Sequence, residues 1–223
     1  VSRRNFALSA VAAAAGVPAV LRGQQGPLRA RLKVDTERII GDINPMIYGN
    51  FIEHLGRCIY GGVFEEKSPL SDSNGFRKDV LDAVKKLNVT QLRWPGGNFS
   101  SNYHWMDGIG PRDQRPPRLE MAWGTVESNR FGTHEFLNYV EKTGSQPYIC
   151  ANFGTGSWLE AQPWVEYCNS SEDTAMTRLR KQNGRAEPWK VSYGALATKW
   201  TALGKWVTGA RKSTASSPSK APS

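Results

Sequence analysis

Several motifs that would define a reaction are missing from this chain of 223 residues. It has no HExxH pair, no phosphate-binding GxxxxGK loop and no GxSxG nucleophile elbow. Its cysteines are an odd set without CxxC spacing, namely Cys58, Cys150 and Cys168, so neither a zinc site nor a disulfide framework is expected. The sequence therefore predicts no metal and no nucleotide cofactor, and buried free thiols are the favoured interpretation of the cysteines.

Acidic residues are absent from both ends of the chain. Residues 1–30 carry four arginines and no acid, and residues 194–223 carry five lysines and arginines and no acid. These two ends account for the whole net charge of +9, so residues 31–193 are neutral overall. A neutral globular part predicts no nucleic-acid partner.

The first residues suggest an export signal. Arg3 and Arg4 precede an uncharged, alanine-rich run over residues 6–21, which is too short for a comfortable membrane span. An amphipathic helix is the alternative, but the run has no polar face. Paired arginines before a short apolar run are typical of twin-arginine export. We expect residues 1–25 to be this signal, and the mature protein to be periplasmic or extracellular, with no membrane segment.

Hydrophobic periodicity in the rest of the chain predicts alternating strands and helices. The expected strands cover residues 29–39, 46–52, 89–94, 147–153 and 189–193, and the expected helices cover residues 76–87, 133–142 and 158–167. From the second strand onward, strand and helix alternate. This order predicts an α/β fold with a parallel sheet and crossover helices.

Polar side chains follow three of the expected strands. Glu53 and His54 follow the second strand, Asn98 follows the stretch from Leu92 to Gly97, and Asn152 ends the fourth. The carboxyl ends of parallel strands share one edge of a sheet, so these groups should converge. Carboxylates and carboxamides bind vicinal hydroxyls, and aromatic rings pack on sugar rings. With His104 and the nearby indoles of Trp94, Trp105 and Trp123, the set favours a carbohydrate pocket.

Each of these residues also has a purely structural interpretation. Glu53 could pair with Arg57 or Arg93, and His54 and His104 could be satisfied structural histidines. Trp123 could anchor the long loop between residues 98 and 131. The aromatic residues after Leu92 could belong to a tight turn packed into the core.

At these residues the sequence resembles the α-L-arabinofuranosidases of glycoside hydrolase family 51. The resemblance spans about residues 31–193 and is carried by the stretches Gly49–Gly62, Leu92–Phe99, Tyr103–Trp105, Asp107–Arg112, Asn129–Phe136 and Pro147–Asn152.

The resemblance implies a (β/α)8 barrel and a β-sandwich built mainly from the C-terminal region. Residues 43–193 would be the N-terminal half of the barrel, and residues 26–42 a strand of the sandwich, which is otherwise missing here. No metal or cofactor is implied. Such enzymes remove terminal L-arabinofuranose from arabinan and arabinoxylan with retention, so the expected partner is an arabinose-containing polysaccharide or oligosaccharide. Homo-oligomers of full-length relatives are compatible with the resemblance.

Site residues follow from the resemblance by position. Glu53 and Asn98 would bind furanose hydroxyls, Trp123 would form an aromatic wall, and Asn152 would line the floor. The family's acid/base is a glutamate after strand four, in the pattern Trp-Gly-x-Gly-Asn-Glu-x-Asp-Gly, and its nucleophile is a glutamate after strand seven. Neither motif is found here. We therefore expect no catalytic residue in this chain, and no activity from it alone.

A frameshift would explain this departure from the pattern. The codons of Gly194–Leu203, read one base over, can encode Trp-Gly-Thr-Gly-Asn-Glu-Met-Asp-Gly-Pro. We therefore predict a single-base deletion near the codon of Tyr193, real or from sequencing, with residues 194–223 as a non-native tail. Two other functions stay open at this point: a barrel glycosidase acting on another sugar such as xylose, and a sugar-binding remnant without catalysis.

Overall fold

The computed structural model describes residues 30–197 and 202–205, and the chain divides into two units after Asp42. Residues 30–42 contain no strand, and the side chains of Leu32, Ile39 and Ile40 are exposed. The strand predicted over residues 29–39 is therefore not formed, because an extended segment is stable only when a neighbouring strand pairs with it. The predicted export signal lies outside the described residues, as does most of the predicted tail.

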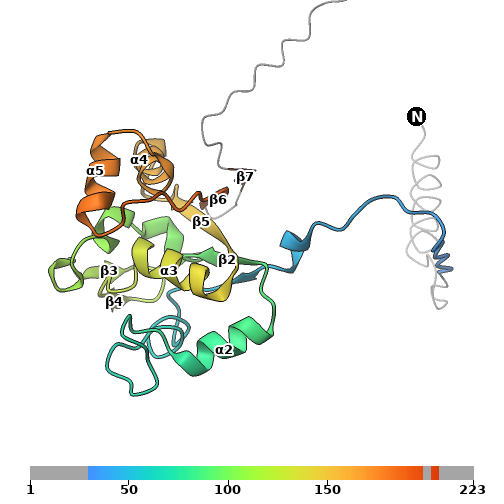
Figure 1. Ribbon diagram of the computed structural model, residues 1–223, viewed down its shortest axis with the longest axis horizontal. Helices are drawn as coiled ribbons and strands as arrows, with labels where there is room; N and C mark the ends of the chain where they lie inside the picture. Colours follow the sequence, from blue (N-terminus) through green and yellow to red (C-terminus); the bar gives the residue numbers. More distant parts are fainter. Residues whose placement is uncertain (1–29, 198–201, 206–223) are drawn as a thin grey trace, which may run out of the picture. The chain divides into compact units, whose positions relative to one another are not determined.

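The second unit is built on a five-stranded sheet with the strand order β1-β2-β5-β6-β7 (Figure 1). Its strands are β1 (Asn50–Phe51), β2 (Gln91–Trp94), β5 (Gln146–Asn152), β6 (Tyr193–Ala197) and β7 (Ala202–Lys205). The first four are parallel to one another, and β7 is antiparallel to β6. The predicted α/β fold with a parallel sheet is confirmed, and the antiparallel β7 is a feature that the sequence did not predict.

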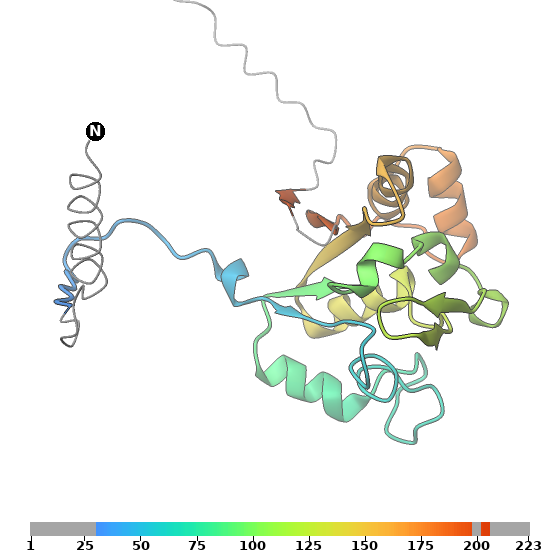
Figure 2. The ribbon, with the colours of Figure 1, turned by 180° about the vertical axis from the view of Figure 1, so that it is seen from behind.

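Within the described residues, four helices connect the strands: α2 (Lys78–Lys86), α3 (Thr133–Thr143), α4 (Trp158–Asn169) and α5 (Ala175–Gln182). Three of them confirm predicted helices, and α5 was not predicted. Helix α3 lies in front of the strands in Figure 1 and behind them in Figure 2. Among the helices described here, none is both long and apolar enough to cross a membrane.

Two predicted strands have other conformations. In the region predicted as residues 46–52, Pro45–Tyr48 forms a 3-10 helix because the Asn44 side chain accepts a hydrogen bond from the Met46 amide, and only Asn50–Phe51 is a strand. The strand predicted at residues 189–193 begins at Tyr193 instead. Lys190 has a φ of 59°, which interrupts an extended chain.

The hydrophobic core lies between the sheet and its helices and is rich in aromatic residues. Trp94 of β2 stacks on Phe136 of α3 with 5.0 Å between ring centroids, and Trp105 stacks on Trp164 of α4 at 5.7 Å. Side chains alternate across a strand, so Leu92 and Trp94 face this core whereas Arg93 faces the other side.

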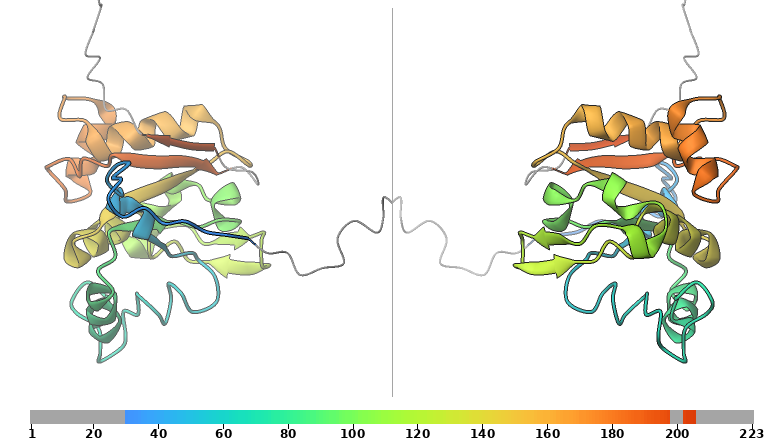
Figure 3. Two further views of the ribbon diagram at one scale, coloured as in Figure 1. Left: turned by 90° about the vertical axis from the view of Figure 1, so that its right-hand side faces the viewer. Right: turned by 90° about the vertical axis from the view of Figure 1, so that its left-hand side faces the viewer.

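The long loop after β2 has structure of its own. It contains the 3-10 helices η2 (Phe99–Asn102), η3 (Trp105–Gly108) and η4 (Arg112–Gln114), and the hairpin strands β3 (Arg118–Glu120) and β4 (Thr125–Glu127). Figure 3 shows this hairpin at the end of the sheet toward which the parallel strands point. The hairpin therefore lies at the edge where the polar strand ends were expected.

Candidate functional site

Glu53 is fixed by the glycine-rich loop that follows β2. Its Oε1 atom accepts hydrogen bonds from the backbone amides of Gly97 at 2.8 Å and Phe99 at 3.2 Å. A side chain at Gly96 would collide with the Glu53 side chain, so a glycine is required there. No ion pair of Glu53 occurs within the described part of the chain. In the same part of the chain, its Oε2 atom accepts no hydrogen bond.

The ends of β1, β2 and β5 lie along one edge of the sheet. Asn98 is flanked by the two amides that bind Glu53, and its exposed carboxamide makes no capping bond to η2. The Thr155 amide donates to the Ser101 carbonyl at 3.0 Å, which joins the loop after β5 to η2. These contacts join the loops that carry Asn98 and Asn152, and the convergence of the Glu53, Asn98 and Asn152 side chains on one ligand stays a prediction.

The carboxamide of Asn152 is largely used within its own loop. Its Oδ1 atom accepts from the amides of Gly154 and Thr155 at 3.0 and 3.1 Å, and its Nδ2 atom donates to Thr155 Oγ1 at 3.0 Å. The side chain is buried. In the structure, the Asn152 side chain stabilises the loop that precedes α4. Its contact with a sugar stays a prediction.

The indoles near the site have separate environments. Trp94 and Trp105 are fully buried in the core, so the expectation that they face a sugar is wrong. The Trp94 and Trp105 side chains project toward the helices. Alternate side chains of β2 lie on the opposite face of the sheet. Trp123 lies in the turn between β3 and β4 and is 36% exposed. None of the contacts described joins Trp123 to Glu53, Asn98 or Asn152.

His54 is a structural histidine that links β1, β2 and the hairpin. Its Nε2 atom accepts a hydrogen bond from Trp94 Nε1 at 2.9 Å, so its proton lies on Nδ1. Nδ1 then donates to Glu127 Oε2 at 2.8 Å, and the Tyr60 hydroxyl donates to Glu127 Oε1. Burial raises the pKa of Glu127, but the bonds from His54, Tyr60 and the Asn129 amide together lower it. The carboxylate is thus kept ionised.

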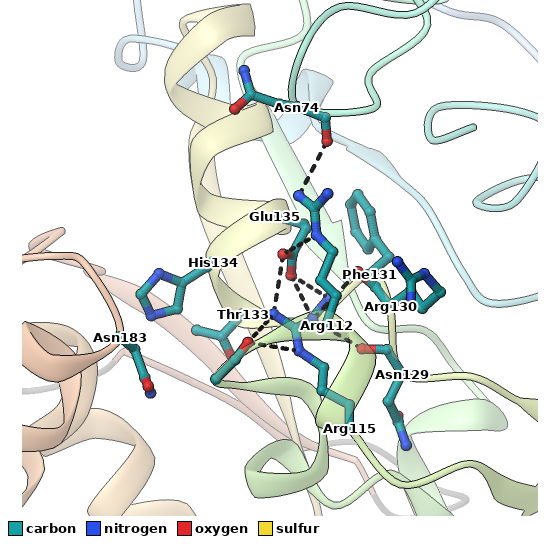
Figure 4. Close-up of polar contacts among 12 residues, drawn as sticks. Asn74, Arg112, Arg115, Asn129, Arg130, Phe131, Thr133, His134, Glu135 and Asn183 are labelled. Atoms are coloured by element: carbon teal, nitrogen blue, oxygen red, sulfur yellow. Dashed lines mark hydrogen bonds and ion pairs between the residues drawn. The ribbon is translucent and has the colours of Figure 1, made fainter. Parts of the chain in front are cut away.

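A second ion-pair cluster anchors the long loop to α3 (Figure 4). Glu135 accepts a two-pronged contact from Arg115 at 2.9 and 3.1 Å, and a bond from Arg112 Nε at 2.9 Å. Arg115 also donates to the carbonyls of Gly110 and Asn129. Burial raises the pKa of Glu135, but these guanidinium groups lower it below its ordinary value. Every charge here is paired, so the cluster is an anchor.

The sequence interpretation did not include Arg93 among the site residues. Its guanidinium lies over the Phe51 ring at 4.8 Å, and it donates to the Gly96 carbonyl at 3.1 Å and to Cys150 Sγ at 2.9 Å. These contacts lie on the sheet face opposite the one that packs against the helices. The register of β2 against β5 pairs Arg93 with Tyr148, so both residues lie on this face.

His104 pairs with an acid at the rim of the site. Its Nδ1 atom lies 3.0 Å from Glu160 Oε1, and the His104 side chain is half exposed. The nearby hollow lined by Phe99, Tyr103, Glu120 and Glu127 holds only about 20 Å³, room for one water molecule and too little for a sugar. Among the described residues, no group of three or more metal-ligating side chains is assembled.

The comparisons with known proteins agree with this geometry. The family model named alpha-L-arabinofuranosidase 1 domain matches residues 83–200. A probable alpha-L-arabinofuranosidase C of Aspergillus terreus is 56% identical over 168 residues, which are 75% of this chain and 33% of that protein. An intracellular exo-alpha-L-arabinofuranosidase of Bacteroides ovatus is 52% identical over 149 residues, or 66% of this chain and 29% of that protein.

A solved structure gives the same result. The alpha-L-arabinofuranosidase of Thermotoga maritima, solved as an arabinose complex, matches with a TM-score of 0.67 and 57% identity. That match covers 68% of this chain and 32% of the other. The fold and these comparisons define an α/β protein of the glycoside hydrolase class. More narrowly, the chain belongs to the α-L-arabinofuranosidases of glycoside hydrolase family 51, and it spans about a third of the length of the curated relatives it matches.

Proposed function

We propose that this chain is the N-terminal part of an enzyme that releases terminal α-L-arabinofuranosyl residues from arabinan and arabinoxylan with retention. The proposal depends on family membership together with two groups at one edge of the sheet. These are an exposed carboxamide and a carboxylate with one oxygen that accepts no hydrogen bond in the described residues. Asn98 and Glu53 supply these groups, and both suit the hydroxyls of a furanose ring.

The proposed architecture is half of a (β/α)8 barrel. The parallel strands β1, β2 and β5 would be its first three strands, β6 occupies the position of the fourth, and the sheet face that carries Arg93 would be its interior. Residues 26–42 would pair with a β-sandwich elsewhere in the whole protein. That pairing would bury the apolar side chains that are exposed here, such as those of Leu32, Ile39 and Ile40. The family resemblance supports this assignment.

In the proposed reaction, this part of the enzyme binds and orients the sugar. Glu53 Oε2 and the Asn98 carboxamide would hold ring hydroxyls, and Trp123 would pack on the ring. A general acid would protonate the glycosidic oxygen while a second carboxylate attacks the anomeric carbon. Water would then hydrolyse the covalent arabinosyl-enzyme with retention. The resemblance assigns both carboxylates to positions after strands four and seven, so this chain alone should bind without turnover.

Two further parts of the proposal concern the ends of the chain. We propose a reading-frame change near the codon of Tyr193, although β6 continues to Ala197 and the family match continues to residue 200. Sequencing the DNA across this codon tests it, and the idea fails if the shifted frame has no open continuation. We also propose twin-arginine export through residues 1–25, which a reporter fusion with Arg3 and Arg4 changed to lysine would test.

Calorimetry with 4-nitrophenyl α-L-arabinofuranoside tests the binding function. We expect a dissociation constant of about 1 mM, corresponding to about −4 kcal/mol, because one side of the site is present. Glu53→Ala should abolish the binding heat, whereas Glu172→Ala, at an exposed acid, should leave it unchanged. The matching xyloside should bind more weakly. An equal heat from wild type and Glu53→Ala would contradict the proposal, and release of nitrophenol by the pure chain would contradict its inactivity.

A further inference from the structure

The hairpin β3–β4 buries its acids and exposes its aliphatic residues. Glu120 lies opposite Thr125 in the ladder, and Leu119 lies opposite Val126. Glu120 is 4% exposed, whereas Leu119 and Val126 are 69% and 72% exposed. An isolated buried carboxylate is expensive unless its hydrogen bonds are made, so the partners of Glu120 determine what it does.

The partners of Glu120 are the backbone of the turn itself. Its Oε1 atom accepts from the Ala122 amide at 2.7 Å, and its Oε2 atom accepts from the Trp123 amide at 2.8 Å. Hydrogen bonds to an ionised acceptor are about twice as strong as neutral ones. Gly124 follows with a φ of +66°, which completes the turn. Both oxygens of Glu120 therefore hold the main chain on either side of the Ala122–Trp123 peptide.

The base of the hairpin is attached to the candidate site by a second buried acid. Glu127 accepts hydrogen bonds from His54 and Tyr60, and His54 directly follows Glu53 in the chain. One carboxylate therefore fixes the hairpin to the strand end that carries Glu53, and the other fixes the tip that carries Trp123. Together, these two carboxylates restrict movement of the hairpin tip.

We propose that Glu120 is a positioning residue that fixes Trp123 for contact with the sugar ring. The inference rests on the proposed function, because only there does Trp123 touch a ligand. Glu120 acts through the Trp123 backbone and makes no contact with the sugar. When its carboxylate is lost, the turn loosens, and the indole spends less time where the ring can pack on it.

Amide exchange and ligand binding test the two halves of this inference separately. NMR would follow hydrogen exchange at the Ala122 and Trp123 amides of the free chain. Calorimetry with 4-nitrophenyl α-L-arabinofuranoside would measure affinity. In Glu120→Ala we expect exchange at both amides to accelerate by about tenfold or more, and affinity to fall by about as much as in Trp123→Ala. The double variant should bind no more weakly than Trp123→Ala alone.

Conservative and matched variants separate positioning from general stability. Glu120→Gln retains one acceptor oxygen and should recover part of the affinity and the protection of one amide. Glu172→Gln should change neither. Exchange at the Ile149 amide, within β5, reports whether each variant is folded, and Glu120→Gln replaces Glu120→Ala if that amide loses protection.

The possible results have distinct meanings. Unchanged exchange at Trp123 in Glu120→Ala overturns the inference, as does faster exchange with unchanged affinity. If the wild-type chain binds no arabinofuranoside, the proposed function fails, and the exchange rates still decide whether Glu120 fixes the turn.

Discussion

Acid pH should destabilise this protein through His134, a largely buried histidine. His134 lies on α3, and its Nε2 atom is 2.6 Å from the Tyr167 hydroxyl. Asn183 Nδ2 donates to the same hydroxyl at 3.0 Å, so the Tyr167 proton is directed at His134, whose Nε2 must be unprotonated. The pKa of His134 is lowered from 6.5 to about 4, chiefly by burial; Glu135 opposes this shift, and the arginines Arg115, Arg185 and Arg180 contribute to it.

The size of the effect follows from the two pKa values. Between pH 6.5 and pH 4 the unfolded chain binds a proton at His134 and the folded chain does not, so stability is lost as the pH falls. Each pH unit within this window costs about 1.4 kcal/mol. From pH 7 to pH 5 the free energy of unfolding should therefore fall by about 2 kcal/mol from this residue.

Urea unfolding at pH 7 and pH 5, followed by tryptophan fluorescence, measures this loss. The His134→Gln variant keeps an acceptor for Tyr167 but cannot titrate, so it should lose about 2 kcal/mol less than the wild type over the same interval. Tyr167→Phe is the matched control, because it removes the hydrogen bond and leaves the buried imidazole. It should be less stable at both pH values and keep the pH dependence. If the wild type and His134→Gln lose equal stability, the assignment to His134 is refuted.

Two substitutions and one labelling experiment test the packing and the ion pairs. Glu135→Gln should lower the free energy of unfolding by about 3–5 kcal/mol in urea titrations, because Arg115 would stay buried without a carboxylate; a loss below about 1 kcal/mol would contradict this. Gly132→Ala should cost about 3 kcal/mol in the same assay, since its methyl group would collide with the Gly108 carbonyl, and a neutral result would contradict that contact. The Cys168 thiol, whose pKa is raised by complete burial, should react with a thiol reagent only on unfolding, and rapid labelling of the native chain would refute its burial.

Much of the sheet could be predicted because each parallel strand is a short apolar run between turn residues. The strand predicted over residues 89–94 is observed at Gln91–Trp94, and helix α4 begins after Ser157, whose side chain accepts a hydrogen bond from the Leu159 amide. Helix α5 was missed because its sequence is mostly polar. It is held by burial of Arg180, which donates to the Tyr167 carbonyl at 2.8 Å, a contact between elements that local periodicity does not reveal.

The candidate site was predicted less completely than the sheet. The positions of Glu53 and Asn98 follow from strand ends, which sequence patterns can locate. The direction in which the Trp94 side chain points depends on which face of β2 the helices cover. Because β2 has only four residues, the alternation of polar and apolar residues does not identify that face. The burial of the acids Glu120 and Glu127 was not predicted. Hydrophobic patterning predicts that Leu119 is buried, which would place the adjacent Glu120 on the exposed face. The partners of the two acids are turn amides and a histidine 73 positions away.

The alternation along β2 and β5 separates two kinds of mutational tolerance. Positions 92, 94, 149 and 151 pack under the helices, so changes there act on folding. Positions 91, 93 and 148 lie on the opposite face of the sheet and are only partly buried, so replacements there should do less damage to the scaffold. A protein engineer could therefore vary positions 91, 93 and 148 while holding positions 92, 94, 149 and 151 constant.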